Sequence, residues 1–252
     1  MVALMKALPE TDPRSYGYQA ALYGTISTAA RPGWGTSQHG NWFFLSWNRM
    51  HLYYFERIGR AVLADPSFTV PYWDFSNGNS LPPEFWQDEN SPLYVAQRSA
   101  DANAGMGVPP VDASLAAALS ATSFTDSPDR HPTGFGGAEG PPNHEGKGAG
   151  ELESSCGPVN TWVGGARGYL SDPNYAALDP IFWLHRANID RLWEAWAQRV
   201  GNENPHHDSW RNQAFDFFDS TGKPVRMTPS EAISTSSLGY VYDHLTVLTT
   251  SL

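Results

Sequence analysis

The sequence contains a single cysteine, Cys156, which excludes an internal disulfide. No continuous apolar stretch approaches the roughly 20 residues that a helix needs to cross a bilayer. The N-terminus also lacks the basic region and apolar core of a secretory signal. We therefore expect a protein with no membrane partner and a cytoplasmic location.

Clusters of basic residues are missing as well. The chain has 16 Lys and Arg residues against 26 Asp and Glu residues, which gives a formal net charge of −10 at pH 7 and a pI of about 5.1. Nucleic-acid binding needs clustered cations that displace counterions from phosphates. This charge balance argues against a nucleic acid and favours a small molecule as the partner.

The length and composition favour one domain. With 252 residues, 40% of them hydrophobic, the chain can bury a sizeable core, and we expect a single domain over residues 1–252. Its 23 glycines and 20 prolines are concentrated in segments that should form loops: 31–35, 76–83, 103–110 and 126–150. The sequence therefore predicts short ordered elements joined by long loops.

Helical patterns dominate between these loops. Segment 41–63 carries apolar residues all round, which is typical of a buried helix. Segment 180–200 shows the same pattern after Asp179 and Pro180, a carboxylate suited to capping and a proline suited to the first turn. Weaker helical patterns cover 1–9, 15–29, 112–121 and 152–162, and the best strand candidates are 68–72 and 239–242. These patterns predict a mostly α fold with few short strands.

Two of the predicted helices carry distinctive motifs. The first includes Asn48, nine residues after His39 and between Trp47 and Arg49, and the second includes Asp179-Pro-Ile-Phe followed by His185-Arg186. Together with residues 12–24, 71–74 and 162–165, these segments resemble the tyrosinase, catechol oxidase and haemocyanin family, in the family's order along the chain. The resemblance covers nearly the whole sequence and implies the family's di-copper-centre fold with a central four-helix bundle.

The resemblance also implies where copper ligands would lie. Relatives hold each copper with three neutral imidazoles, because borderline nitrogen ligands suit copper and leave faces open for dioxygen. At the matching positions this chain has, in order, Tyr23, His39, Asn48, Cys156, Asn160 and Arg186. The last ligand could instead match the preceding residue, His185, so both assignments stay open. Ser37 stands where some relatives tether the second histidine to a cysteine.

With most imidazoles replaced, we expect neither a coupled copper pair nor any other cofactor. If a metal does bind, His39 and His185 are its expected ligands. His51, three residues after Asn48, has two interpretations: a substitute group in the same pocket, or a hydrogen-bonded core residue. The other histidines occupy polar or terminal contexts and are expected at the surface: His131, His144, His206, His207 and His244.

The replacing side chains are polar rather than small or apolar. A buried guanidinium is costly without a partner, so we expect Arg186 either to pair with a carboxylate or to await an anionic group of a substrate. The candidate carboxylates are Asp179, Glu56 and Asp190. Cys156 beside a cation would have a lowered pKa, whereas as a small apolar filler it would be inert.

These side chains favour proton transfer and anion binding. Tyr23 would act as the acid and Arg186 as an anion clamp. The base would be His39 or His185. The remaining candidates, which would orient the substrate or assist proton transfer, are Asn48, His51, Cys156 and Asn160.

Three functions are compatible with this set of residues. The leading hypothesis is a copper-independent enzyme that uses the former metal cavity for acid/base chemistry on a small, anionic metabolite that is phenolic or otherwise unsaturated and oxygen-rich. Cyclisation, isomerisation or elimination would fit. A second hypothesis keeps metal-dependent oxidation of the tyrosinase type at a remodelled site, and a third is a non-catalytic binding or partner protein. Metal content, oxygen uptake and ligand turnover discriminate among the three.

Overall fold

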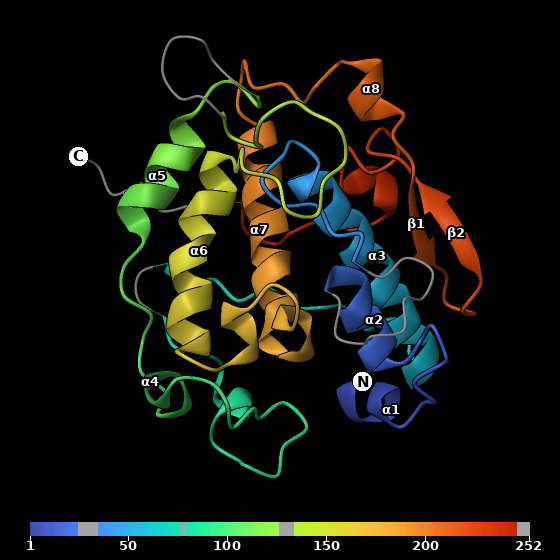
Figure 1. Cartoon of the computed structure of the whole chain (residues 1–252), viewed down its shortest axis with the longest axis vertical. Coiled ribbons are helices and arrows are strands. Elements are labelled where there is room, and N and C mark those ends of the chain that lie inside the picture. The colour runs from blue at the N-terminus through green and yellow to red at the C-terminus, as the bar shows by residue number, and fades with distance from the viewer. Residues whose placement is uncertain (25–34, 77–78, 126–133, 246–252) are drawn as a thin grey trace.

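The computed structural model describes residues 1–24, 35–76, 79–125 and 134–245. Its helices are α1 (Val2–Lys6), α2 (Tyr16–Tyr23), α3 (Phe44–Leu63), α4 (Ala100–Asn103), α5 (Asp112–Ser120), α6 (Glu151–Gly164), α7 (Ile181–Ala197) and α8 (Asp208–Arg211), and its strands are β1 (Phe215–Phe218) and β2 (Pro224–Met227). In Figure 1, α5 and α6 lie on one side of α7, and α2 and α3 lie on the other. The predicted mostly α fold with few strands is confirmed.

Helices α3 and α7 contact each other in the core of the fold. The Phe55 ring of α3 stacks on Trp183 of α7, with 3.4 Å between the centroids. A buried ion pair crosses the same interface, where Arg49 donates to Asp190 at 2.5 Å and its guanidinium lies 3.8 Å from the centroid of the Trp193 ring. The buried helices predicted at 41–63 and 180–200 are therefore confirmed.

Asp179 fixes the start of α7. Its carboxylate accepts a hydrogen bond from the Ile181 N–H at 3.1 Å, while Pro180 has no N–H to satisfy. The same carboxylate receives two hydrogen bonds from Arg98, at 2.6 and 2.8 Å. Both side chains are fully buried. This ion pair anchors the helix that carries Arg186.

The predicted strands are wrong. The observed antiparallel sheet pairs β1 with β2, and β1 contacts α3. Residues 68–72 are held instead by side chains of α3, since Arg60 donates to the Phe68 carbonyl at 2.7 Å and Glu56 accepts from the Val70 N–H at 2.9 Å. An extended segment whose polar backbone groups are satisfied by side chains needs no partner strand.

Residues 239–242 also form no strand, because two of their side chains are hydrogen-bonded to α7. The hydroxyls of Tyr240 and Tyr242 both donate to Asp190 of α7, at 2.6 and 2.7 Å. The hairpin that does form turns at Asp219, whose carboxylate accepts the Thr221 N–H at 2.8 Å. An Asp that bonds the backbone two residues further on is a turn signal, and it marks the point between the two observed strands.

The remaining predicted helices are observed with adjusted ends. Segment 152–162 lengthens to α6, 112–121 matches α5 and 1–9 shortens to α1. Segment 15–29 begins as α2, and its residues 25–29 lie outside the described part of the chain. Single 3-10 turns lie at Pro83–Phe85, Tyr169–Ser171, Ala176–Leu178 and Ser236–Leu238. Within the described residues, no helix combines the length and apolar character needed to cross a bilayer.

Candidate functional site

Three of the positions matched to copper ligands meet in one place. Tyr23 ends α2, His39 lies on the loop before α3, and Arg186 lies on α7. The Tyr23 and His39 rings are 5.2 Å apart in an edge-to-face arrangement. The Arg186 guanidinium lies 5.0 Å from the centroid of the Tyr23 ring and donates a hydrogen bond to its hydroxyl. We call these three residues the Tyr23 cluster.

Local hydrogen bonds fix Tyr23 at the end of α2. Ser15 caps the helix by accepting from the Tyr18 N–H at 3.2 Å, and the Tyr23 carbonyl accepts from the Ser37 hydroxyl at 2.5 Å. Burial raises the pKa of Tyr23 to about 12, and the Arg186 charge opposes the shift. Tyr23 therefore stays a neutral phenol near neutral pH. Because its oxygen accepts from Arg186, its own hydrogen is available to donate to another oxygen.

His39 is held by Glu153 of α6. The Nδ1 atom lies 3.0 Å from one oxygen of Glu153, and the other oxygen accepts the Gly40 N–H at 3.0 Å. Burial lowers the pKa of His39, and the Glu153 hydrogen bond opposes the shift. In the neutral ring Nδ1 donates to the carboxylate, so Nε2 is left as an acceptor. Among the described residues, this buried Nε2 has no hydrogen-bond partner.

A loop over residues 138–148 positions the backbone of His39. The His39 N–H donates to the Asn143 carbonyl at 3.2 Å, and its carbonyl accepts from the Gly146 N–H at 3.0 Å. Gly40 has a φ of 57°, and a Cβ there would collide with the carbonyl of Gly146. Glycine thus allows two chain segments to cross closely, and the crossing brings the His144 ring to 6.0 Å from the His39 ring.

Glu153 and His144 are site residues that the sequence did not predict. His144 was expected at the surface, but its ring is partly buried and its Nδ1 lies 2.9 Å from the Ser37 hydroxyl oxygen. Its approach depends on the loop crossing, for which no motif gives a signal. Glu153 had one signal: it stands three residues before Cys156, a spacing that puts both side chains on the same side of a helix.

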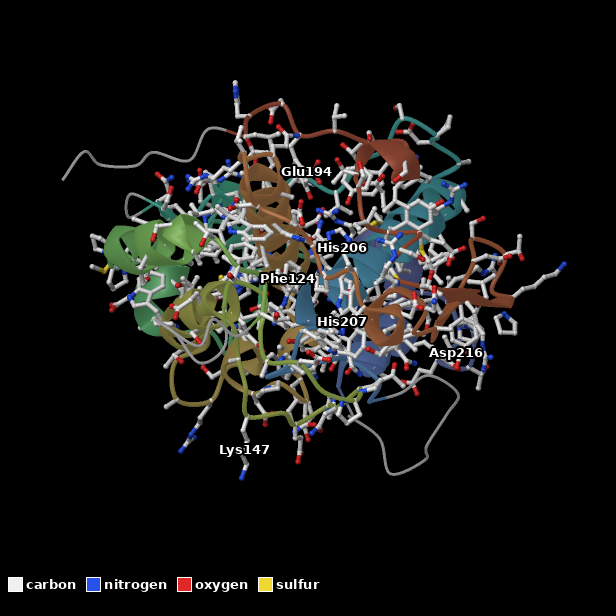
Figure 2. The ribbon with its side chains drawn as sticks, turned by 90° about the horizontal axis from the view of Figure 1, so that it is seen from above. Phe124, Lys147, Glu194, His206, His207 and Asp216 are labelled. Atoms are coloured by element: carbon white, nitrogen blue, oxygen red, sulfur yellow. The ribbon has the colours of Figure 1, made fainter. Side chains whose placement is uncertain are left out.

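Three of the other histidines are exposed, as predicted. His206, His207 and His244 all have exposed side chains, and Figure 2 labels the first two on the segment that precedes α8. His131 lies outside the described residues. None of the exposed three contributes to the Tyr23 cluster.

Arg186 has no carboxylate partner in the described part of the chain, although it is only 4% exposed. Its guanidinium lies among aromatic rings, 5.0 Å from the centroid of Phe182 and 5.1 Å from that of Phe44. Its Nε atom is buried without a hydrogen-bond partner there. The expected acids have other partners: Asp179 pairs with Arg98, Glu56 with Arg60 and Asp190 with Arg49. A buried cation that meets only ring faces and one neutral hydroxyl attracts an anionic group.

His185 points away from the Tyr23 cluster. Its ring lies 4.9 Å from that of Phe75 and 6.3 Å from that of Trp73. Both ring nitrogens are buried and have no hydrogen-bond partner among the described residues. Burial, with a smaller contribution from the Arg186 charge, lowers its pKa well below 6.5. Of the two adjacent candidates for the last ligand position, Arg186 is the one that contacts Tyr23.

His51 follows the second of its two interpretations. Its Nε2 lies 3.1 Å from the Gln19 carbonyl oxygen, and its ring is 4.8 Å from that of Trp47 and 4.9 Å from that of Trp183. The side chain is 1% exposed. His51 is therefore a hydrogen-bonded core residue with aromatic neighbours, and these contacts do not include the Tyr23 cluster.

Among the described residues, neither of the two asparagines has a hydrogen bond to the Tyr23 cluster. Asn48 donates to the carbonyl of Phe44, one turn earlier in α3, at 2.7 Å. Asn160 lies on α6, and its Oδ1 is buried without a hydrogen-bond partner in the described part of the chain. Their expected role in orienting a substrate stays a prediction.

The structure distinguishes between the two alternatives for Cys156. Burial raises its pKa to about 12, and the nearby Arg186 charge offsets only part of this shift. Desolvation therefore outweighs the cation, so the alternative of a lowered pKa does not hold. Cys156 matches the alternative of a small buried apolar residue.

We expect this thiol to be nearly inert in the native protein. Labelling by iodoacetamide at about pH 8 should be at least roughly 100-fold slower than in the unfolded chain, because the thiolate is the reactive form. Mass spectrometry after timed labelling, with and without denaturant, measures the ratio. Equal rates in the two states would contradict the buried, protonated thiol.

The donor set of the matched positions does not fit a coupled copper pair. Among the described residues, no group of three or more His, Cys, Asp and Glu side chains converges as a metal site. Within the Tyr23 cluster, His39 is the single imidazole, and the Arg186 cation would repel a metal ion at the same place.

Comparison with known proteins identifies relatives along nearly the whole chain. Residues 13–114 and 138–199 match a family model described as the common central domain of tyrosinase, and residues 205–249 match the polyphenol oxidase middle domain. A tyrosinase from Hahella sp. (strain CCB-MM4) is 33% identical over 94% of this chain and 58% of its own length. The chloroplastic polyphenol oxidase of Malus domestica is 29% identical over 97% of this chain and 45% of its own length. A crystal structure of Grenache (Vitis vinifera) polyphenol oxidase matches with a TM-score of 0.81 at 26% identity, over 96% of this chain and 79% of that chain.

These comparisons confirm the predicted family resemblance and correct two other predictions. The chain spans about half the length of the curated relatives it matches. The cytoplasmic location is contradicted, because the plant relatives from Malus domestica and Vicia faba are named chloroplastic. The expected absence of a cofactor is contradicted by the match to the tyrosinase family. Copper is thus the cofactor that these relatives imply, although the donor set of the matched positions does not fit a coupled pair.

Proposed function

The chain belongs to the tyrosinase family, and from this premise we propose that it is an oxidoreductase of the polyphenol oxidase type, with a remodelled metal site, that acts on small phenolic molecules. The strongest support is the meeting of Tyr23, His39 and Arg186, three positions that match metal ligands of relatives, in one buried cluster. By the family resemblance, these positions match ones that hold copper in relatives. We infer that the substrate of this chain binds at the Tyr23 cluster.

The proposed substrate is a phenol with an acidic group. Arg186 lacks a carboxylate partner among the described residues, so an anionic group would balance its charge. The rings of Phe44 and Phe182 that pack beside it are buried, so the surroundings of its charge are apolar. The side chains of His39 and Glu153 are 18% and 14% exposed, which makes this side of the cluster the accessible one.

Two groups of the Tyr23 cluster can handle protons. Tyr23 is a neutral phenol whose hydrogen can be donated to an oxygen of the substrate. His39 is held at Nδ1 by Glu153, which leaves Nε2 as an acceptor for a substrate proton. Arg186 would orient the substrate by its anionic group.

A second candidate is proton-transfer chemistry at the same cluster, such as cyclisation, isomerisation or elimination of a phenolic or enolic metabolite. What favours it is the pairing of a protonated phenol, Tyr23, with an imidazole that is oriented by a carboxylate, His39. Such a pair can protonate one atom of a substrate and deprotonate another.

Oxygen uptake separates the two candidates. Protein purified without chelators and loaded with Cu(II) is incubated with dihydrocaffeate, an acidic catechol, while dissolved oxygen and product masses are followed. We expect oxygen uptake, with kcat/KM lowered roughly 10- to 100-fold by Arg186→Gln, because one charge-assisted hydrogen bond to the substrate is lost. For the neutral methylcatechol, the same substitution should change kcat/KM by less than about threefold.

The matched control is Arg167→Gln, which removes the same charge from an exposed position and should retain full activity. Conversion of dihydrocaffeate without oxygen uptake would exclude the oxidoreductase and support the second candidate. If folded, copper-loaded protein neither consumes oxygen nor converts the acid, both candidates fail.

A further inference from the structure

A cavity of about 790 Å³ lies apart from the Tyr23 cluster. Its walls are the middle and C-terminal part of α3, the middle of α7, and three segments: 69–74, 79–83 and 238–243. We call it the Tyr72 cleft. None of the eight predicted site residues lines it. Its volume falls in the range of about 300–1,000 Å³ that is typical of small-molecule sites.

Aromatic side chains line the Tyr72 cleft: Tyr53, Tyr72, Trp73, Tyr240 and Tyr242. Hydrogen bonds hold four of them. Tyr240 and Tyr242 donate to Asp190 at 2.6 and 2.7 Å, Tyr72 donates to Asp243 at 3.0 Å, and the Trp73 indole donates to the Ser80 carbonyl at 2.9 Å. The Tyr72 and Tyr242 rings meet edge to face, 5.9 Å apart. Because these hydroxyls are engaged, the cleft is preformed and presents ring surface to a ligand.

The carboxylates of the Tyr72 cleft already have partners: Glu56 pairs with Arg60, Asp74 with Arg191, Asp190 with Arg49, and Asp243 accepts from Tyr72. Arg57 differs from them. It is exposed, its guanidinium lies 4.9 Å from the centroid of the Tyr53 ring, and it forms no ion pair within the described residues. Among the described residues, the cleft therefore presents one guanidinium, beside an aromatic wall, that pairs with no carboxylate.

We propose that the Tyr72 cleft is a binding site for an aromatic monocarboxylate. The ring of the ligand lies against Tyr53 and Tyr72, and its carboxylate meets Arg57, whose planar guanidinium offers two parallel donors. The surrounding carboxylates disfavour a ligand with a second negative charge. The site shares no residue with the Tyr23 cluster, so the proposal does not depend on the function proposed there.

Calorimetric titration of the full chain with para-coumarate and with its neutral amide tests this proposal. We expect the acid to bind roughly threefold to tenfold more tightly than the amide, because an ion pair at a partly exposed site adds a modest gain. Arg57→Gln should abolish this preference, whereas Arg167→Gln, an exposed change of the same charge, should preserve it. Tyr53→Leu should weaken binding of both ligands by removing ring surface.

His39→Gln distinguishes the two sites, because it alters the Tyr23 cluster and leaves the Tyr72 cleft intact. Unchanged affinity in this variant supports the proposal. Loss of binding in His39→Gln but not in Arg57→Gln would place the ligand in the Tyr23 cluster and overturn the proposal, without rejecting the function proposed there. Equal affinities of wild type for acid and amide, or no binding at about millimolar concentration, would also overturn it. Thermal unfolding of each variant verifies that it is folded.

Discussion

Replacing Arg98 with methionine is expected to lower the free energy of unfolding by about 3–5 kcal/mol. Arg98 gives two hydrogen bonds to the carboxylate of Asp179 and further ones to the carbonyls of Phe85 and Leu93. Both members of the ion pair are fully buried. The substitution leaves the Asp179 carboxylate without its cation in a region shielded from water, so its desolvation is no longer offset. Urea unfolding followed by tryptophan fluorescence measures the difference.

The matched control is Arg14→Met. Arg14 pairs with Asp12 through side chains that are 37% and 19% exposed, and solvent screening should keep the change below about 1 kcal/mol. Combining Arg98→Met with Asp179→Leu should recover part of the lost stability, because neither charge is then left alone. A loss in Arg98→Met no larger than that in Arg14→Met would mean that burial of the pair has no energetic consequence.

The contrast with Arg186 explains why the Tyr23 cluster is the candidate site. Arg49, Arg98 and Arg186 are all buried, and the first two meet carboxylates. Arg186 meets only a phenol and aromatic rings in the described part of the chain. An unbalanced buried cation lowers stability, so its presence is better explained by a ligand than by the fold.

The central helices could be predicted because their pattern has one structural solution. A segment such as 41–63, with apolar residues all round, can remove its side chains from water only as a helix inside the core. The observed helix α3 matches this segment. The meeting of Tyr23, His39 and Arg186 was predictable for another reason. Their motifs follow the order of the tyrosinase family along the chain, so the positions of relatives could be carried over one by one.

The structural features that the sequence did not predict depend on contacts that form only when the chain has folded. Glu153 reaches His39 across 114 residues of sequence. The acidity of Cys156 depends on whether burial or the neighbouring cation has the larger effect, and that balance is set by the completed fold. Segment 68–72 has a strand-like composition, but Arg60 and Glu56 of α3 satisfy its backbone. Apart from the spacing of Glu153 to Cys156, no local sequence pattern indicates these contacts.

His51→Gln is expected to make the protein less sensitive to acid. Burial lowers the pKa of His51 from 6.5 to about 3. As the pH falls below 6.5, the unfolded chain takes up a proton that the folded protein does not, so stability present at higher pH is lost on the way to pH 3. For one proton the loss is about 1.4 kcal/mol per pH unit, or roughly 2–3 kcal/mol between about pH 6 and pH 4. Glutamine does not titrate but can still donate to the Gln19 carbonyl, so the variant lacks this contribution.

Unfolding free energies of wild type and variant across this pH range isolate the effect, since both proteins share the same carboxylates. His185, whose pKa burial also lowers well below 6.5, gives an independent comparison. His185→Gln should remove a slope of the same sign, and the double variant should remove both. Parallel curves for wild type and His51→Gln would mean that the folded protein protonates His51 as readily as the unfolded chain does. The rings of Trp47 and Trp183 beside it would then have to stabilise an imidazolium strongly enough to cancel its desolvation.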